Sequence, residues 1–280
     1  MNGEAVKIFG HKPSWTAWVG MAIVGLNIIA AVFAPWVAPY DPNDIIGDAW
    51  ADPDWQHWLG LDNLGRDLLS RMIYGARTSI GLSLVITCLS FVIGIIAGFT
   101  ASIMGGWVDA ALSRFVDLML SMPTLIFAFI VLSVLGTDIP VLIITIAILD
   151  STRVFRLSRA VSMTIASLEF VEAAKVRGEG LWWIITREIL PNAVPPLVAE
   201  FGLRFCFTFL LIAALSFLGL GIQPPDADWG SMVKDLRDMI NLGQPQPLYP
   251  AGAIAFLTIG VNFIVDWMLS VHSKGYGEGA

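Results

Sequence analysis

Six long apolar runs alternate with polar segments along the chain. A helix needs about 20 apolar residues to cross a bilayer, because the hydrocarbon core is about 30 Å thick and each residue advances about 1.5 Å. Five of the six runs reach that length. The pattern therefore predicts an all-α, polytopic membrane protein with six transmembrane helices. The runs lie at residues 15–34, 79–103, 115–135, 139–149, 197–220 and 250–271.

The fourth run is the shortest, with an uncharged stretch of 11 residues. It can cross the membrane only if its helix continues through Asp150 and Arg153 to about Leu157. Long arginine side chains near a helix end can reach the lipid headgroups. Asp150 and Arg153 are three residues apart, so we expect them to pair along one helix face.

The composition agrees with a membrane protein. Hydrophobic residues make up 56% of the chain and charged residues only 14%, whereas soluble domains carry about 25% charged residues. The first run lacks a small-residue cleavage site and is predicted to stay as an anchor. Cys88 and Cys206 lie inside apolar runs without a neighbouring His or Cys, so we interpret both as buried apolar residues.

Loop charges predict the orientation. With the N-terminus in the cytoplasm, ten Lys and Arg residues fall inside and five outside, which follows the positive-inside rule. The C-terminus is then cytoplasmic too. The predicted organisation is a cytoplasmic segment at 1–14, a first transmembrane helix at 15–34, an outer loop at 35–78, a five-helix core at 79–271 with a cytoplasmic loop at 151–196 and an outer loop at 221–249, and a cytoplasmic tail at 272–280.

The outer loops hold twelve aspartates against five basic residues, so the net charge of -7 resides on the outer face. This face could steer a cationic solute or a basic docking partner. Alternatively, the aspartates only serve turns. Two of these loops are rich in Pro, Gly and Trp and are predicted to be ordered, with their tryptophans packed on the membrane-facing surface or on each other. These tryptophans are Trp36, Trp50, Trp55, Trp58 and Trp229.

The cytoplasmic loop contains a compact pattern. Residues 172–176 favour a short helix, and Gly178 is suited to end it because glycine tolerates left-handed backbone angles. A second amphipathic run at 181–190 leads to Pro191. We expect a helix-turn-helix knob, with Ala173 and Ala174 leaving room for close approach by another surface.

Glu172, Ala173, Ala174, Gly178, Leu190 and Pro191 resemble the cytoplasmic loop signature of binding-protein-dependent ABC importer permeases. In that family the short coupling helix fits a cleft on the ATPase subunit, so the resemblance implies that Glu172, Ala173, Ala174 and Gly178 form this contact. Glu188 departs from the pattern, which has an apolar residue or, in the peptide branch, a His there. An Ala-Ala pair beside a Glu is common by chance, but the match to Gly178 and Leu190-Pro191 makes the coupling interpretation specific.

The loop before the second run narrows the resemblance to the dipeptide, oligopeptide and nickel permeases, in particular to the second of their two subunits. It carries Gly65, Arg66, Asp67, Arg71 and Arg77 in the pattern of that branch. Arg66 can either pair with an aspartate to hold the loop or contact substrate. Further matches at 216–221, 223–225 and 229–230, with Asn262 and Asp266, extend the resemblance over nearly the whole chain.

Small and ionisable residues inside the runs have two interpretations each. Gly94 and Gly98 form a small-residue motif that favours close helix packing over a pore role. Ionisable residues in a span are candidates for function, so Asp150 and Asp266 are candidate gate residues. Asp117 and Arg204 belong to the same group.

The chain has no Gly-x-x-x-x-Gly-Lys-Ser/Thr loop for holding ATP, and His11, His57 and His272 are far apart in sequence. We therefore expect no enzyme activity and no cofactor or metal in this chain. The resemblance implies that ATP and Mg²⁺ bind two partner ATPase subunits. It further implies a homologous but distinct permease partner, an external substrate-binding protein, membrane lipid around the chain, no nucleic acid, and residence in a bacterial inner membrane.

Short peptides are the substrate that the resemblance favours. Nickel or metal chelates, opines and oligosaccharides are the alternatives within the same class. A secondary transporter or channel that works without ATP is the alternative from another class, and it would need an inverted repeat or an intramembrane ion path.

Overall fold

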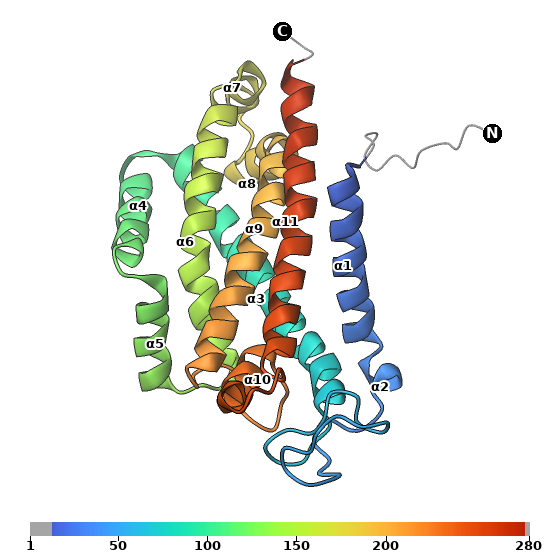
Figure 1. Cartoon of the computed structure of the whole chain (residues 1–280). Helices are drawn as coiled ribbons and strands as arrows, with labels where there is room; N and C mark the ends of the chain where they lie inside the picture. Colours follow the sequence, from blue (N-terminus) through green and yellow to red (C-terminus); the bar gives the residue numbers. More distant parts are fainter. Residues whose placement is uncertain (1–12, 278–280) are drawn as a thin grey trace, which may run out of the picture. The chain divides into compact units, whose positions relative to one another are not determined.

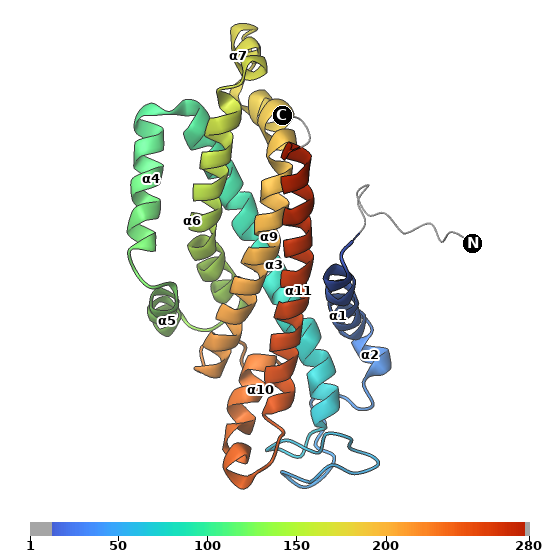
Figure 2. The same cartoon turned by 45° about the horizontal axis from the view of Figure 1, so that its top comes forward.

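The computed structural model describes residues 13–277, and every regular element in that part of the chain is a helix. The predictions for the two termini therefore fall mainly on residues outside the described part, 1–12 and 278–280. Figures 1 and 2 show the helices. They are α1 (Trp15–Val32), α2 (Ala34–Val37), α3 (Leu68–Met104), α4 (Gly106–Leu120), α5 (Thr124–Leu135), α6 (Ile139–Ala166), α7 (Glu169–Val176), α8 (Leu181–Trp183), the π-helix η1 (Ile184–Ile189), α9 (Leu190–Phe217), α10 (Trp229–Leu236), the 3-10 helix η2 (Arg237–Leu242) and α11 (Leu248–Gly277).

Four helical stretches of the described residues are long and apolar enough to cross a membrane. They are α1, α3, the continuous stretch Leu181–Phe217, and α11 as far as Val271, and the bent pair of α4 and α5 makes a fifth if it counts as one span. The all-helical, polytopic class is thereby confirmed. Helix α6 continues through Asp150 and Arg153 as expected and is 28 residues long, or about 42 Å. Its charges exclude it from the apolar set, so the number six stays a prediction.

The third apolar run does not form the single helix that its composition predicts. Helices α4 and α5 meet at an angle of 87°. Pro123 stands at the break, as the residue before α5. Proline has no N–H to donate and disfavours helical angles in the residue before it, so the α4 helix cannot continue into α5. The break was not predicted, because the run at 115–135 is apolar on both sides of Pro123.

Helix α3 begins at Leu68, inside the segment predicted as outer loop 35–78. The carboxylate of Asp67 explains the early start, because it accepts hydrogen bonds from the backbone N–H and the hydroxyl of Ser70, both at 2.7 Å. This is the N-cap arrangement that satisfies an unpaired N–H in a first helical turn. The helix therefore begins 11 residues before the predicted span at residue 79, and where the span enters the membrane stays a prediction.

The segment predicted as the cytoplasmic loop, 151–196, is largely helical in the structure. Helix α6 extends to Ala166, and α9 begins at Leu190 and includes Pro195 and Pro196. The segment outside these two helices is therefore only 167–189, and it contains α7, α8 and η1.

The described part of the chain forms two compact units, one from residues 13–83 and 209–277 and the other from 84–208. In the first unit, α1 lies along α11 (Figure 1). Gly20 permits this close approach, because a Cβ atom there would lie only 2.5 Å from the carbonyl oxygen of Gly260. Small residues at such contacts let helix backbones come together in lipid.

In the second unit, Gly94 and Gly98 bring α3 against α6. A Cβ at Gly94 would lie 2.6 Å from Val154 Cβ, and one at Gly98 would lie 2.8 Å from the carbonyl oxygen of Phe155. The predicted packing role of this motif is confirmed.

Replacing Gly98 with leucine is expected to destabilise the protein by about 1–3 kcal/mol, because the new side chain meets backbone atoms that cannot yield. Thermal unfolding of the purified chain in detergent measures this effect. Gly81→Ala in the same helix is the matched control, since no atom lies within 4 Å of its Cβ position. Equal unfolding temperatures for the Gly98→Leu variant and the wild type would contradict the packing role.

The expected burial of tryptophans and cysteines is only partly correct. Trp229 is 2% exposed, whereas Trp36, Trp55 and Trp58 are exposed. Cys206 is buried as expected, but Cys88 is exposed. Cys88 lies on α3 among apolar surface residues, and such a surface is stable when it faces lipid or a partner helix.

Candidate functional site

Helix α7 projects beyond the end of α6 and forms the knob that the cytoplasmic loop predicts (Figure 2). Its inner face consists of Val171 and Ala174, which are fully buried, and its outer face includes the exposed Glu172 and Ala173. Gly178 ends the helix with φ +80°. The backbone N–H of the next residue bonds back to the carbonyl of Ala174, as at many glycine C-caps.

The knob is continuous with the apolar core of its unit. The buried side chains of α7 pack with Ile184, Ile185 and Ile189 of the following turn, and Leu190 packs against the same cluster from its edge. Phe99 of α3 and Ile165 of α6 belong to this cluster as well. A force applied to α7 therefore passes directly to these helices. Of the predicted loop residues, Ala174 and Leu190 pack into the apolar core beneath the knob. Glu172 and Ala173 are exposed on its outer surface.

Arg177 explains the departure from the family pattern at Glu188. Its guanidinium lies 3.7 Å from the Glu188 carboxylate and 5.7 Å from the centre of the Trp183 ring. These contacts join the end of α7 to the second arm of the knob, residues 181–190. The polar residue at 188 is thus accommodated at the surface of the knob and leaves its core apolar.

Pro191 lies in the first turn of α9, directly after the π-helix η1. A proline inside a continuous helix clashes with the carbonyl four residues earlier and cannot donate to it. The π-turn widens the helix at this point, and the N–H of Leu190 bonds to the carbonyl of Ile185, five residues back. The Leu190-Pro191 pair therefore sets the direction in which α9 leaves the knob.

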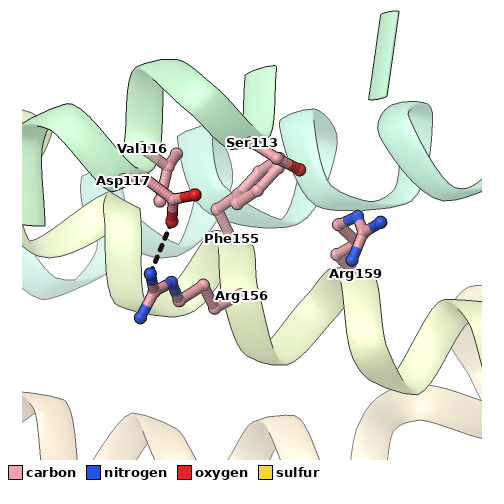
Figure 3. A pocket seen from close by; sticks show the side chains of 6 residues that line it. All are labelled: Ser113, Val116, Asp117, Phe155, Arg156 and Arg159. Carbon is pink, nitrogen blue, oxygen red and sulfur yellow. Dashed lines mark hydrogen bonds and ion pairs between the residues drawn. The ribbon is translucent and has the colours of Figure 1, made fainter. Parts of the chain in front are cut away.

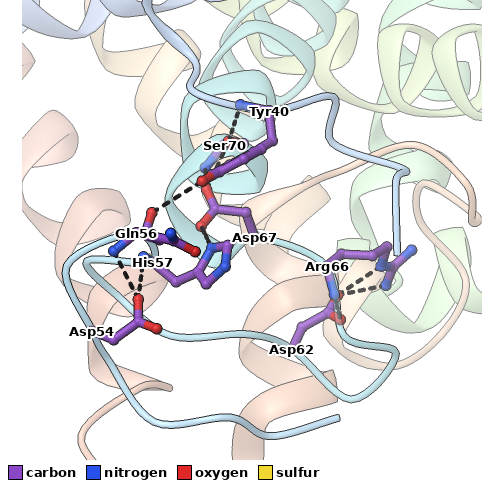
Figure 4. Close-up of polar contacts among 8 residues, drawn as sticks. All are labelled: Tyr40, Asp54, Gln56, His57, Asp62, Arg66, Asp67 and Ser70. Atoms are coloured by element: carbon purple, nitrogen blue, oxygen red, sulfur yellow. Dashed lines mark hydrogen bonds and ion pairs between the residues drawn. The ribbon is translucent and has the colours of Figure 1, made fainter. Parts of the chain in front are cut away.

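The outer-loop motif is a buried charge network in the first unit (Figure 4). The Arg66 guanidinium lies 2.7 Å from the Asp62 carboxylate, and Arg71 Nε lies 3.3 Å from the same oxygen. All three side chains are buried. Gly65 has φ +76° and lies against the carbonyl of Gly47, where a side chain would clash. Arg66 thus pairs with an aspartate of its own loop, as one of the two interpretations expects.

A second group of the same loop surrounds Asp67. His57 Nδ1 lies 3.3 Å from this carboxylate, and the His57 ring packs against Tyr40 in a tilted arrangement with 5.2 Å between centroids. Asp54 holds the preceding turn, and the backbone N–H of His57 lowers the pKa of its carboxyl group. Arg77 is exposed and takes no part in either group.

Asp228 is a buried carboxylate that our sequence analysis did not single out. It accepts hydrogen bonds from the Ser79 hydroxyl at 2.8 Å and from the Ser231 N–H at 2.9 Å, and it caps α10. Burial raises the pKa of Asp228 by disfavouring its charged form, although its hydrogen bonds oppose this shift. The Asp-x-x-Ser spacing could have indicated the helix cap but not the contact with distant Ser79.

Asp150 is paired in the structure, as predicted, and has a further partner. Arg153 Nη1 lies 3.8 Å and Arg204 Nη1 lies 3.6 Å from its carboxylate, while the Thr208 hydroxyl donates to it at 3.2 Å. Arg204 Nε also lies 2.7 Å from Glu200. Asp150 therefore connects α6 to α9. Asp266, the other candidate gate residue, is exposed on α11.

Arginines of α6 also pair with aspartates of α4. Arg159 donates to both carboxylate oxygens of Asp109 at 2.5 and 2.6 Å, and Arg156 donates to Asp117 at 2.5 Å. A cavity of about 160 Å³ lies between these helices, and Figure 3 shows the side chains that line it. Asp109 could not be singled out from the sequence, because only the three-residue spacing of the arginines on α6 indicated a common face. The cavity is lined by Ser113, Val116, Asp117, Phe155, Arg156 and Arg159.

Residues 90–277 match the family of binding-protein-dependent transport system inner membrane components, and residues 12–57 match the N-terminal transmembrane domain of oligopeptide transport permease C. The chain belongs to the first of these families. It is an inner membrane component of a transport system, and its class is that of a membrane permease, not an enzyme.

Individual relatives resemble the chain over most of its length. It is 35% identical to the di/tripeptide transport system permease protein DppC of Pseudomonas aeruginosa over 92% of this chain and 87% of the relative. It is 34% identical to the probable D,D-dipeptide transport system permease protein DdpC of Escherichia coli, with coverage of 87% and 82%. The nickel transport system permease protein NikC of Escherichia coli is 32% identical, with coverage of 90% and 91%.

Proposed function

We propose that this chain is one of two different permease subunits in an ATP-driven importer of short peptides. Two separate ATPase subunits bind ATP and Mg²⁺ and supply the energy, and an external binding protein delivers the peptide. The translocation pathway lies between this chain and a homologous partner permease. The chain on its own transports nothing.

The main support for this proposal is that the α7 knob has an exposed outer face and a buried inner face. It presents Glu172, Ala173 and Val176 outward, and Val176 is 88% exposed, while its inner face belongs to the core of the unit. An exposed surface of small and apolar residues on a rigid support fits a cleft on another protein. When ATP binding closes the ATPases, their clefts move α7, and its support transmits the motion to α6 and α9.

The proposed topology has six transmembrane helices with both termini in the cytoplasm. Helix α6 is the least certain of these spans by composition, because its second half carries charges. Asp150 is buried and paired within the unit, and the arginines beyond it contact aspartates of α4. Pairing of this kind makes a charged helix tolerable at membrane depth. The knob then lies in the cytoplasm and the Arg66 loop outside.

Short peptides are the proposed substrate because relatives in several organisms carry dipeptide or di/tripeptide names. The relative named for nickel transport makes nickel the second candidate. Selectivity in such a system depends largely on the external binding protein, which is a different polypeptide.

Uptake into proteoliposomes tests the proposal. The vesicles contain this chain, its partner permease and the two ATPases, with ATP inside and the binding protein outside. We expect uptake of radiolabelled dipeptides that requires both ATP and the binding protein. Uptake of radioactive nickel without peptide uptake would replace the substrate assignment. Transport by this chain alone, without ATP, would instead favour a channel or secondary transporter.

A further inference from the structure

Two tryptophans of the loop between α2 and α3, residues 38–67, are left uncovered by the fold. Trp55 is 96% exposed, and Trp58, three residues further on, is 71% exposed. Single exposed apolar residues are ordinary on a protein surface, but tryptophan is the residue that gains most from being covered by a partner. The pair is therefore a candidate for the centre of an interface.

The turn that carries Trp55 is held in a fixed shape (Figure 4). The carboxylate of Asp54 accepts hydrogen bonds from the backbone N–H groups of Gln56 at 2.8 Å and of His57 at 2.6 Å. His57 Nδ1 lies 3.3 Å from the buried carboxylate of Asp67, which caps α3. The backbone under Trp55 is thus already ordered, so a partner that covers this side chain loses little free energy to ordering the loop.

The exposed charges of this loop are all negative. Its only Lys or Arg is Arg66, which is buried and paired with Asp62. Two of the exposed aspartates flank Trp55 in the sequence. The exposed aspartates of the loop are Asp41, Asp44, Asp48, Asp52 and Asp54. A partner that covers the tryptophans therefore meets negative charge beside them.

This charge selects among the surfaces that could cover Trp55. Anionic lipid headgroups repel the aspartates, and an ionised carboxylate loses its hydration when it enters the apolar part of a bilayer. A second copy of the chain would bring the same negative loop against itself, and like charges across an interface are unfavourable. A protein surface with basic residues around an apolar pocket satisfies both the tryptophans and the aspartates.

We propose that Trp55, Trp58 and the exposed aspartates of this loop form the surface on which the external binding protein docks. The binding protein supplies an apolar pocket for Trp55 and basic residues around it. The inference rests on the proposed function, whose topology places this loop outside, where the binding protein delivers its substrate. Aromatic residues at the centre of an interface mainly set how long a complex lasts, whereas charges around them mainly set how fast it forms.

Uptake by the four-subunit complex in proteoliposomes, measured against the concentration of binding protein, tests the role of Trp55. Trp55→Ala should raise the concentration needed for half-maximal uptake by about 10-fold or more and leave the maximal rate unchanged. Trp36→Ala is the matched control, since Trp36 is 78% exposed but lies in α2, outside this loop. It should shift that concentration less than about twofold. A wild-type concentration dependence for Trp55→Ala would overturn the inference.

Binding kinetics separate the two parts of the surface. With the complex in nanodiscs, Asp44→Asn combined with Asp48→Asn should slow association of the binding protein by roughly threefold or more at low salt and weaken its dependence on salt. Trp55→Ala should instead speed dissociation. Association that is equally fast and equally salt-dependent in the double variant and the wild type would overturn the role of the aspartates and, with it, the argument for a basic partner.

Chemical labelling distinguishes a docking surface from a lipid contact. Trp55→Cys is introduced in a Cys88→Ser, Cys206→Ala background of the complex in proteoliposomes and exposed to a charged, water-soluble thiol reagent. We expect rapid labelling of residue 55 that the binding protein slows at least about threefold, because docking covers the side chain. An unrelated basic protein should give no protection. Residue 55 unreactive without the binding protein would place it in lipid and overturn the inference.

The order of measurement keeps this inference separate from the proposed function. Wild-type uptake that requires ATP and the binding protein is established first, and its absence would refute the proposed function itself. Uptake that is present and equally sensitive to the binding protein in Trp55→Ala and the wild type would refute only the docking surface.

Discussion

Ala173→Arg is expected to abolish ATP-driven uptake while the chain still folds and inserts. Ala173 is exposed on the outer face of α7, so the longer side chain disturbs no core contact. At the proposed contact with the ATPase it buries an unpaired charge, which costs about 2–5 kcal/mol. Because about 1.4 kcal/mol is a factor of ten, uptake should fall by roughly 30-fold to several thousand-fold. Uptake and co-purification of the ATPase subunits are the two measurements.

Thr164→Arg is the matched control for this variant. It places the same side chain at an exposed position in the last turn of α6, outside the knob. We expect it to retain both the ATPases and uptake. If Ala173→Arg also kept its ATPases and transported at the wild-type rate, α7 would not be the coupling element, and the proposed mechanism would have to be abandoned.

The knob could be predicted because its signals are local. Helix-favouring residues, a glycine with φ +80° and a proline after the second arm all act on their own backbone, so their spacing indicated both arms and the turn. Its division into surface and core was not predictable. Ala173 and Ala174 are adjacent in sequence, yet only Ala174 is buried, because the neighbouring turn covers one face of the helix.

Ion pairs were likewise predictable from the sequence only where both residues lie on one helix. The contact of Asp150 with Arg153 follows from a three-residue spacing within one helix, whereas Arg204 approaches Asp150 from α9. The Asp109–Arg159 contact likewise joins positions 50 residues apart. Such pairs depend on which helices become neighbours, and the apolar pattern of a membrane chain says little about that, since lipid and helix interfaces are both apolar.

The break between α4 and α5 and the early start of α3 were missed for a different reason. In both places a single residue indicated the helix boundary, but the boundary was predicted from the hydropathy of the run instead. Pro123 lies within an apolar run, and Asp67 lies in a segment rich in turn residues. Backbone chemistry at these two residues determined the boundaries, because a missing N–H ends a helix and a capping carboxylate begins one.

Asp62→Ala in the outer loop is expected to show the largest loss of stability, about 3–5 kcal/mol, because it leaves buried positive charge without a partner. Asp62 accepts from Arg66 Nε at 2.7 Å and from the backbone N–H groups of Leu64 and Arg66 at 2.9 and 3.0 Å, and Arg71 lies 3.3 Å away. Alanine removes all of these contacts. Hydrogen exchange of the loop amides at 41–67 measures the local free energy of unfolding.

Two further variants make the cause of this loss testable. Asp44→Ala, at an exposed aspartate in the same loop whose backbone N–H donates to the Asp41 carbonyl, should change loop exchange by less than about 0.5 kcal/mol. Asp62→Ala combined with Arg66→Ala should lose less stability than the sum of the two single variants, because removing one buried guanidinium relieves part of the uncompensated charge. Strict additivity would mean that Asp62 acts only through its backbone hydrogen bonds, and the charge network would then have no part in holding the loop.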